Sequence, residues 1–289
     1  MPLPRGVLYA AVFILGASVG SFLNVCIYRL PRERSVVAPP SHCPQCGARL
    51  RAIDLVPLLS FLALGGKCRW CGGVIGWRYF AVELLTGVVF VAAWIACGQG
   101  VQTISPWIQT VPCWIFAAVI IAVVFTDLDH MIIPDSLVVA GVAAGALAEG
   151  ISVWSGQAPL LSVAIPGTAL ALPKFVAGGL LGVAVFVVIR GFSQLLFRRE
   201  GMGMGDVKLA GAIGAMLGPN LALLSFGLAI VAGAVLGVAL LLLRVRRRME
   251  YLPFGPFLAA AALVAMLAPE QVRAGAAAAY ERWMGLFGW

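Results

Sequence analysis

Charged side chains are scarce in this chain of 289 residues, and acidic ones are the scarcest. Asp, Glu, Lys and Arg make up 11% of the sequence, whereas a soluble domain carries about 25% of them. There are twelve acidic residues against twenty basic ones, while hydrophobic residues reach 62%. This composition excludes an ordinary soluble domain and predicts a polytopic membrane protein.

Polar interruptions divide the apolar sequence into about eight candidate spans. A bilayer span needs about 20 apolar residues, and the candidates are 6–28, 79–98, 112–126, 136–153, 174–192, 207–224, 226–243 and 254–268. Only Gly218-Pro219-Asn220 and Gly227 interrupt the stretch 207–243, so seven or nine spans are also compatible with the sequence. The first span lacks a convincing cleavage site and any basic residue before it except Arg5, which predicts a retained helix rather than a signal peptide. We therefore expect an all-α polytopic membrane fold.

Basic residues gather on one side of this topology. With residues 29–78 in the cytoplasm, sixteen of the twenty Lys and Arg residues face inward, and the others are Arg5, Lys174, Arg273 and Arg282. This bias follows the positive-inside rule and places both termini outside. The net charge of +8 is therefore interpreted as a topology signal. We expect contact with the lipid bilayer and no binding of nucleic acid.

The only long polar insertion, 29–78, contains two Cys-x-x-Cys pairs, Cys43/Cys46 and Cys68/Cys71. The 21 residues between the pairs give the spacing of a zinc ribbon. Four thiolates fill a tetrahedral Zn²⁺ site and leave no position for a substrate, so the metal would be structural. Disulfides, a redox centre or unpaired thiols are alternatives, although cytosolic thiols are kept reduced. His42 could also replace one of the cysteines.

Five carboxylates lie at or just inside the cytoplasmic ends of predicted spans. A carboxylate inside the bilayer costs roughly 2.5–3.5 kcal/mol or more, so each is a candidate functional group. The five are Glu83, Asp127, Asp129, Asp135 and Asp206.

Asp127 has the deepest position, and Asp129 lies about 200° around a helix from it. Because the residue before Pro134 avoids the helical region, we expect Asp135-Ser136 to begin the next span as an N-cap. Asp206 follows Gly203-Met204-Gly205, where the lack of side-chain bulk would let a substrate backbone approach. A plain N-cap is the structural alternative for Asp206.

Two aspartates on separate helices at one membrane face suggest a catalytic dyad. Close carboxylates cannot both ionise easily, so one would activate water as a base while the other protonates a peptide carbonyl. The sequence offers no comparable arrangement of Ser, Cys and His, because His42 and His130 are the only histidines.

Taken in order, several motifs resemble those of bacterial type IV prepilin peptidases, which are aspartic proteases of the GxGD group. The resemblance covers nearly the whole chain. It rests on GSFLNVCIYRLP at 20–31, SHCPQCG at 41–47, CRWCGGVIGWRYFAVELLTG at 68–87, DLDHMIIPD at 127–135, GMGDVKLAGAIGAMLG at 203–218 and PFGPFLAAAA at 253–262.

The resemblance implies roles for six residues. Asp127 and Asp206 match the catalytic aspartates, and the metal ligands would be Cys43, Cys46, Cys68 and Cys71. It also implies an endopeptidase in the bacterial inner membrane. The substrates would be prepilins and pseudopilins, cut after a Gly at the cytoplasmic face and then N-methylated with S-adenosylmethionine.

This chain departs from the family in one motif and leaves the methyl-transfer site unassigned. Phe80 stands where the family usually has a proline. No glycine-rich S-adenosylmethionine motif is present, and Arg78 and Glu83 are candidates for structural or methyl-transfer support.

The expected organisation has four parts. These are a first transmembrane helix at 1–28, a cytoplasmic zinc-binding domain at 29–78, a transmembrane peptidase domain at 79–268 and an extracytoplasmic tail at 269–289.

Three other functions remain open. A presenilin-type intramembrane protease shares GxGD but would lack the cysteine insertion and the DLDHMIIPD block. A transporter with buried aspartates and a zinc-sensing loop would often show inverted repeats, and none is visible. A thiol oxidoreductase would place its cysteines toward a quinone or the outer face.

Overall fold

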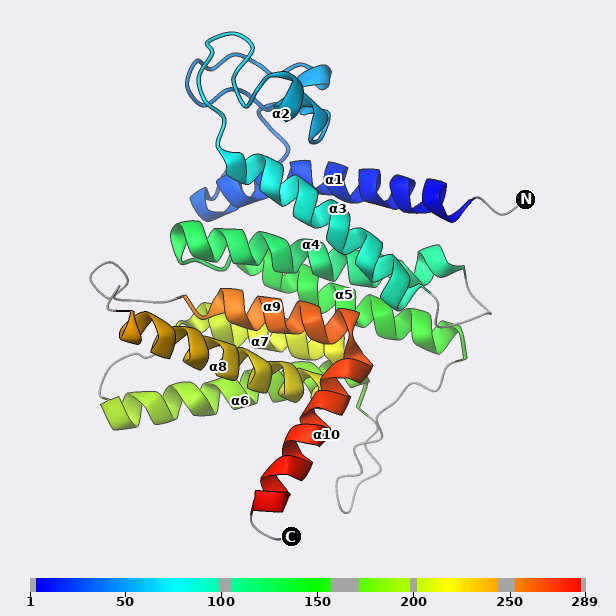
Figure 1. Ribbon diagram of the computed structural model, residues 1–289, viewed down its shortest axis with the longest axis vertical. Helices are drawn as coiled ribbons and strands as arrows, with labels where there is room; N and C mark the ends of the chain where they lie inside the picture. Colours follow the sequence, from blue (N-terminus) through cyan, green and yellow to red (C-terminus); the bar gives the residue numbers. More distant parts are fainter. Residues whose placement is uncertain (1–3, 99–104, 157–171, 198–201, 244–252, 287–289) are drawn as a thin grey trace. The chain divides into compact units, whose positions relative to one another are not determined.

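The computed structural model describes residues 4–98, 105–156, 172–197, 202–243 and 253–286. The chain forms two compact units, residues 1–100 and 101–289 (Figure 1). Most of the described residues are helical, and they contain no strand, only two isolated bridges in the cysteine insertion. The all-α fold expected from the sequence is confirmed.

The first unit is built on two helices that cross at glycines. They are α1 (Arg5–Arg29) and α3 (Trp77–Cys97). A Cβ atom on Gly16 would lie 2.7 Å from the Phe90 Cβ, and one on Gly20 would lie 2.8 Å from the Glu83 Cα. A Cβ on Gly87 would collide in the same way with the ring of Phe13, at 2.7 Å. The helix backbones can therefore approach as closely as small residues allow in membrane proteins.

The polar insertion between α1 and α3, which carries the cysteines, has little regular structure. It contains η1 (Leu30–Arg32), η2 (Ala52–Leu55) and the short helix α2 (Leu59–Ala63). Asn24 of α1 donates to the Tyr79 carbonyl at 3.0 Å. This hydrogen bond joins the end of α1 to the start of α3, where the polar insertion begins and ends.

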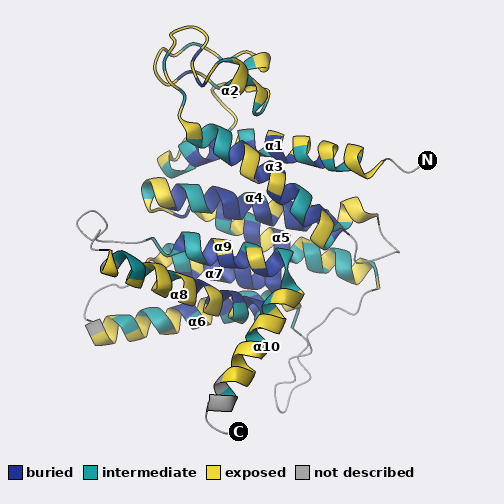
Figure 2. Cartoon of the chain, viewed as in Figure 1, coloured by how far each residue is buried: buried dark blue, intermediate teal, exposed yellow. Residues whose placement is uncertain are grey.

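The second unit surrounds one short helix with longer ones. Its helices are α4 (Pro106–His130), α5 (Asp135–Trp154), α6 (Lys174–Phe197), α7 (Met204–Leu217), α8 (Pro219–Leu242), α9 (Gly255–Leu267) and α10 (Pro269–Leu286). Most of α7 is buried, whereas α10 is largely exposed (Figure 2).

Small residues on α7 bring its backbone against both neighbouring helices. On α6, a Cβ atom at Gly178 or Gly182 would collide with the backbone of Gly214 or Ala210. On α5, a Cβ at Gly145 would lie 2.5 Å from the Ala215 carbonyl oxygen. The position of α7 is therefore fixed from two sides by backbone contact.

A carboxylate from α5 satisfies the first backbone donors of α6. Glu149 accepts the N–H groups of Lys174 at 2.8 Å and Phe175 at 2.7 Å. A helix N-terminus leaves its first N–H groups without intrahelical partners and carries partial positive charge, so an anion is stabilising there. This contact explains a carboxylate that the sequence places near the end of a span.

Six helical segments of the described residues are long and apolar enough to cross a membrane, and a seventh is possible if α9 and α10, bent by 107°, form one span. The predicted boundary at 224 is wrong, because Gly218 adopts a φ of +74° and α7 ends at Leu217. At 14 residues, α7 is about 21 Å long, shorter than the hydrocarbon core of about 30 Å.

Gly182→Ala should destabilise the protein, because the new methyl group meets the α7 backbone. Overpacking of this kind costs about 1–3 kcal/mol. Gly191→Ala is the matched control on the same helix, since nothing lies within 4 Å of its Cβ position. Thermal unfolding in detergent should show a lower midpoint for Gly182→Ala only. Equal midpoints for the two variants would contradict close packing of α6 on α7.

Candidate functional site

The four predicted metal ligands come together in two similar knuckles. In the first, the Cys43 N–H donates to the Ala48 carbonyl and the Gly47 N–H donates to the Cys43 carbonyl, both at 2.9 Å. In the second, Cys68, Gly73 and Gly72 repeat this pattern at 2.8 and 3.0 Å. Gly47 and Gly72 have φ values of +71° and +68°, which residues with a side chain rarely adopt. A glycine in the left-handed region therefore follows the second cysteine of each pair.

The four sulfur atoms have the spacing of a tetrahedral metal site. All lie within 4.8 Å of one another, with Cys43 Sγ 3.9 Å from Cys71 Sγ and Cys46 Sγ 4.0 Å from Cys68 Sγ. A Zn–S bond of about 2.3 Å implies an edge of about 3.8 Å between ligands of a tetrahedron. His42 is not part of the cluster, since its Nδ1 contacts the Pro40 carbonyl at 3.1 Å. The cluster can therefore hold a metal ion such as zinc.

The local electrostatics favour the thiolate form of Cys68 and disfavour that of Cys71. The backbone N–H groups of Cys71 and Trp70 lower the pKa of the Cys68 thiol to about 7. At Cys71 the Gly73 N–H favours the thiolate, but desolvation and the neighbouring sulfurs outweigh it and raise the pKa to about 11. Several thiolates this close together require a cation to offset their repulsion.

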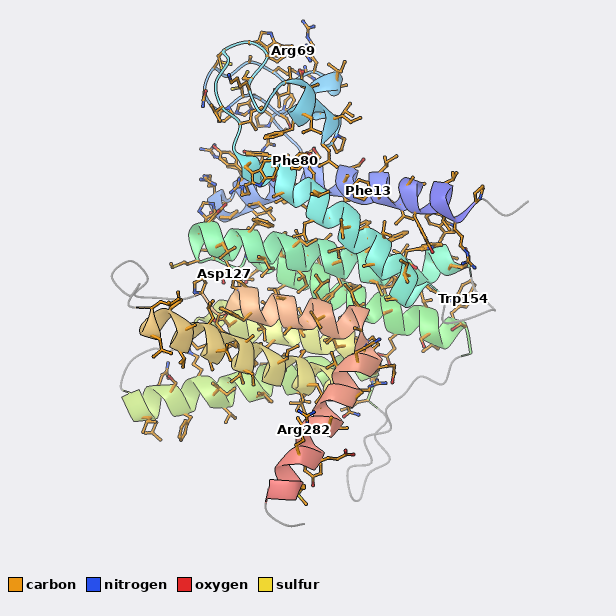
Figure 3. The ribbon with its side chains drawn as sticks, viewed as in Figure 1. Phe13, Arg69, Phe80, Asp127, Trp154 and Arg282 are labelled. Carbon is orange, nitrogen blue, oxygen red and sulfur yellow. The ribbon has the colours of Figure 1, made fainter. Side chains whose placement is uncertain are left out.

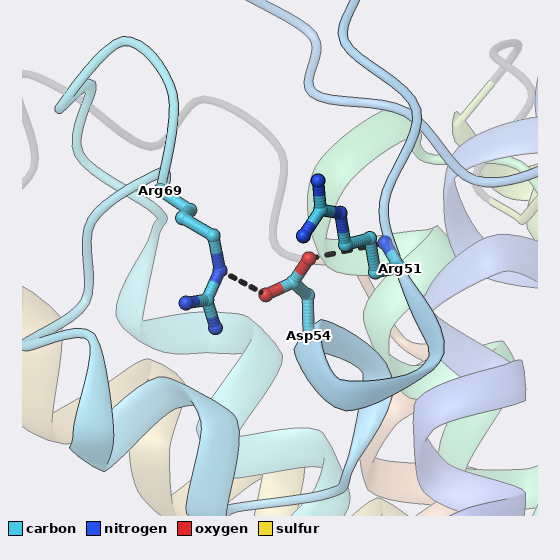
Figure 4. Close-up of polar contacts among 3 residues, drawn as sticks. All are labelled: Arg51, Asp54 and Arg69. Carbon is cyan, nitrogen blue, oxygen red and sulfur yellow. Dashed lines mark hydrogen bonds and ion pairs between the residues drawn. The ribbon is translucent and has the colours of Figure 1, made fainter.

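A buried carboxylate braces the second knuckle against η2 (Figure 4). Asp54 accepts the Arg69 Nε–H at 2.8 Å and the Arg51 backbone N–H at 3.0 Å. Burial raises the pKa of Asp54, but these hydrogen bonds and the two guanidinium charges lower it further, so the pKa lies below its usual range. Asp54 thus links the residues before α2 to the residue that follows Cys68.

The two predicted catalytic aspartates both lie in the second unit, on different helices. Asp127 is 7% exposed and lies in the last turn of α4 (Figure 3). Asp206 is half-buried in the first turn of α7. The two carboxylates are close enough to repel one another electrostatically. Each also faces a backbone donor, Gly255 N–H for Asp127 and Gly203 N–H for Asp206.

Three helix ends and one connecting segment form the surroundings of these carboxylates. A Cβ at Gly205 would lie 3.2 Å from the Ile133 Cβ, and one at Gly255 would lie 3.4 Å from the Ile133 Cδ1. A Cβ at Gly255 would also collide with the carboxylate of Asp127. The side chain of Ile133 therefore packs against both glycines, and the site is built from α4, α7, α9 and the segment after α4.

Asp135 does not have the role expected from the sequence. It is the first residue of α5, and Pro134 occupies the N-cap position without a side-chain cap. The carboxylate instead pairs with the Lys208 Nζ at 2.7 Å. The N-cap prediction failed because Lys208, 73 residues away, supplies a charge partner that local sequence does not reveal.

The other acidic candidates have different surroundings. Asp129 is exposed and follows Asp127 within the same helix, so the expected divergence of the two side chains is confirmed. Asp206 is not the N-cap of α7, because Gly203 occupies that position and Asp206 lies three residues later. Its contact with the Gly203 N–H is half of a capping box, so Asp206 also stabilises the helix start.

Two residues at the candidate sites were missed by sequence reasoning. Gly255, in the PFGP stretch, supplies a backbone donor to Asp127, and only the motif itself signalled its importance. Asn24 is 3% exposed, and its Oδ1 atom has no hydrogen-bond partner among the described residues. No local pattern could have indicated that a buried acceptor would remain unsatisfied.

Comparisons with known proteins agree with the motifs. Residues 14–97 match the family described as the bacterial peptidase A24 N-terminal domain, and residues 114–238 match the type IV leader peptidase family. Proteins named prepilin leader peptidase/N-methyltransferase from Aeromonas hydrophila and Pseudomonas aeruginosa are 33% and 32% identical, over 90% of this chain and 90% of each relative. The protein of the same name from Bacillus subtilis is 32% identical over 89% of this chain and 92% of its own length. No solved structure matches the chain significantly. The chain belongs to the type IV leader peptidase family.

Proposed function

We propose that this protein is an aspartic endopeptidase that removes the leaders of type IV prepilins and pseudopilins and then methylates the new N-terminus. The observation that carries the proposal is the pair of interacting carboxylates, Asp127 and Asp206, on two helix ends. The names of the relatives support the same two reactions. Transport and thiol oxidation have no comparable support.

The surroundings of the two carboxylates suit peptide hydrolysis. One carboxylate acts as a base and takes a proton from water, whose oxygen attacks the scissile carbonyl carbon. The other, carrying a proton, donates it to the carbonyl oxygen and forms the tetrahedral intermediate. The first carboxylate then gives the proton that it took from water to the leaving nitrogen, the second takes a proton back from a hydroxyl of the intermediate, and the C–N bond breaks. Gly203 leaves space for an extended substrate beside Asp206, because only Asp206 Oδ2 at 3.8 Å and Gly205 N at 3.9 Å lie near its Cβ position, whereas Ile133 fills the space at Gly205. The Gly255 N–H orients Asp127.

The proposed setting is the bacterial inner membrane, with the catalytic pair at its cytoplasmic face. The positive-inside bias supports this orientation. A prepilin has a basic leader joined to an apolar helix, and the cleavage position after Gly would then meet the enzyme at the membrane surface. Within this arrangement, residues 29–78 would be the cytoplasmic zinc-binding domain, 79–268 the peptidase domain and 269–289 an extracytoplasmic tail.

Asp127→Asn and Asp206→Asn should each abolish leader cleavage, because an amide can neither accept the proton from water nor share one with its partner. The measurement is mass spectrometry of a prepilin incubated with each purified variant. We expect a loss of at least about a thousandfold, as for removal of a group essential to proton transfer and electrostatics together.

The matched control is Asp129→Asn, which makes the same chemical change two residues away on an exposed position. It should leave cleavage at the wild-type rate. Substantial cleavage by either well-folded Asp127→Asn or Asp206→Asn would exclude the dyad.

The four cysteines would hold one structural Zn²⁺, since the sulfur spacing fits the ion and leaves no ligand position for a substrate. When bound, the ion would offset the thiolate charges and join the two knuckles. We do not assign it a step in hydrolysis.

Cys43→Ser and Cys68→Ser should lower the zinc content of the purified protein from one ion per chain toward zero. Cys97→Ser is the control, because Cys97 lies outside the cluster. Elemental analysis by mass spectrometry measures the metal, and limited proteolysis should show faster cutting within 33–76 of the cluster variants. Full zinc content in a cluster variant would contradict the assignment.

The second proposed reaction requires S-adenosylmethionine, which supplies a methyl group from a sulfonium sulfur to the amine. The nitrogen–carbon bond forms as the sulfur–carbon bond breaks, and the amine loses one proton. Mass spectrometry of the cleaved pilin detects the added methyl group.

A further inference from the structure

A cavity of about 230 Å³ lies within the first unit and is not used by the proposed peptidase reaction. Its walls come from α1, α3 and the cysteine insertion, and include Asn24, Arg29, Phe61, Phe80 and Glu83. Ligand cavities in proteins measure about 300–1,000 Å³. This one is therefore large enough for part of a small-molecule ligand.

Asn24, which lines the cavity, has a polar atom that the protein itself leaves unsatisfied. Asn24 donates its Nδ2 hydrogen to the Tyr79 carbonyl, which fixes the orientation of the amide. Its Oδ1 is then a buried acceptor without a partner among the described residues. A buried acceptor that lacks a hydrogen bond costs about 1–3 kcal/mol, so a ligand that donates there would recover this energy.

A buried carboxylate also lines the cavity. Glu83 is 9% exposed and accepts the Leu58 N–H at 2.8 Å, while the Ser21 hydroxyl also donates to it. Leu58 has a φ of +62°, so this hydrogen bond holds a strained turn in place. A carboxylate has about four acceptor positions, which leaves capacity for a cationic ligand.

The cavity also offers a positive group and aromatic surface. Arg29 is 7% exposed, and its guanidinium donates to the carbonyls of Ser35 at 3.0 Å and Pro39 at 2.7 Å, two of five possible hydrogen bonds. The rings of Phe61 and Phe80 pack with centroids 5.4 Å apart. Aromatic faces attract organic cations with no need for a hydrogen bond.

We propose that this cavity binds the amino-acid end of S-adenosylmethionine, a deepening that rests on the methyl transfer proposed above. Glu83 and the Asn24 Oδ1 accept hydrogen bonds from the α-ammonium group, and Arg29 attracts the carboxylate. Phe61 and Phe80 lie beside the sulfonium. The nucleoside extends out of the cavity, because 230 Å³ holds only the smaller part of the molecule.

The presence of both charge signs favours the methyl donor over the pilin N-terminus as the occupant. A newly cleaved pilin presents an ammonium group followed by a peptide bond. Its N-terminal residue has no free α-carboxylate that the Arg29 guanidinium could bind. The amino-acid end of S-adenosylmethionine carries an ammonium, a carboxylate and a sulfonium, and the cavity has groups suited to all three.

The test is equilibrium binding of S-adenosylmethionine to the purified full-length protein in detergent, measured by calorimetry without any pilin. Glu83→Gln and Asn24→Leu should each weaken binding by about tenfold or more, as expected for loss of a hydrogen bond to a charged group. Glu149→Gln is the matched control. Like Glu83, Glu149 accepts backbone N–H groups, but it lies in the other unit, and its substitution should leave the affinity unchanged.

Zinc content and the unfolding midpoint establish that each variant is folded. If the variants do not fold, a ligand-side measurement on the wild type replaces them. Decarboxylated S-adenosylmethionine lacks the carboxylate assigned to Arg29 and should bind the wild type about tenfold more weakly.

The outcomes separate this inference from the proposed function. Unaltered affinity in folded Glu83→Gln and Asn24→Leu, in a wild type that binds the donor and methylates, would overturn the inference alone. Equal affinity of the decarboxylated compound would also overturn it. A wild type that cleaves prepilins but neither binds the donor nor methylates would overturn both this inference and the methyl-transfer half of the proposed function.

Discussion

Backbone contact between α7 and its two neighbours is the constraint on which the candidate peptidase site depends. α7 has only 14 residues, and glycines on α5 and α6 let its backbone lie against theirs. A buried helix held on two sides cannot shift without opening voids, because protein interiors are closely packed. Asp206 lies in the first turn of α7, so the same packing fixes the position along the helix axis at which its carboxylate interacts with that of Asp127.

The acidic residues that the sequence places near span ends serve three different physical purposes. Glu149 satisfies backbone donors at the start of α6, and Asp135 pairs with Lys208. Asp127 and Asp206 have no such basic partner among the described ion pairs, and they face one another as well as single backbone N–H groups. Two carboxylates that repel one another lower the stability of the folded protein. Such a pair is therefore expected at a functional site and not as a contribution to folding.

Features set by short-range chemistry could be predicted from the sequence, and those set by distant contacts could not. The cysteine knuckles were predictable because each forms within a few residues and needs a glycine just after the second cysteine. The α7 boundary was misjudged because the apolar stretch 207–243 has two weak interruptions, and the helix ends at the first of them, Gly218, and not near Gly227. The role of Asp135 depended on Lys208, and that of Asn24 on Tyr79, both remote in the chain.

The block GSFLNVCIYRLP shows how one short motif can combine packing with recognition. Gly20 allows α1 to approach the Glu83 backbone, and four residues later Asn24 lies on the same side of the helix, one turn along. The close approach that Gly20 permits therefore lets Asn24 of α1 and Glu83 of α3 line the same cavity. A larger residue at position 20 would move α3 away from α1 and separate these two groups. Gly20 is thus needed for the proposed binding cavity as well as for the packing of α1 on α3.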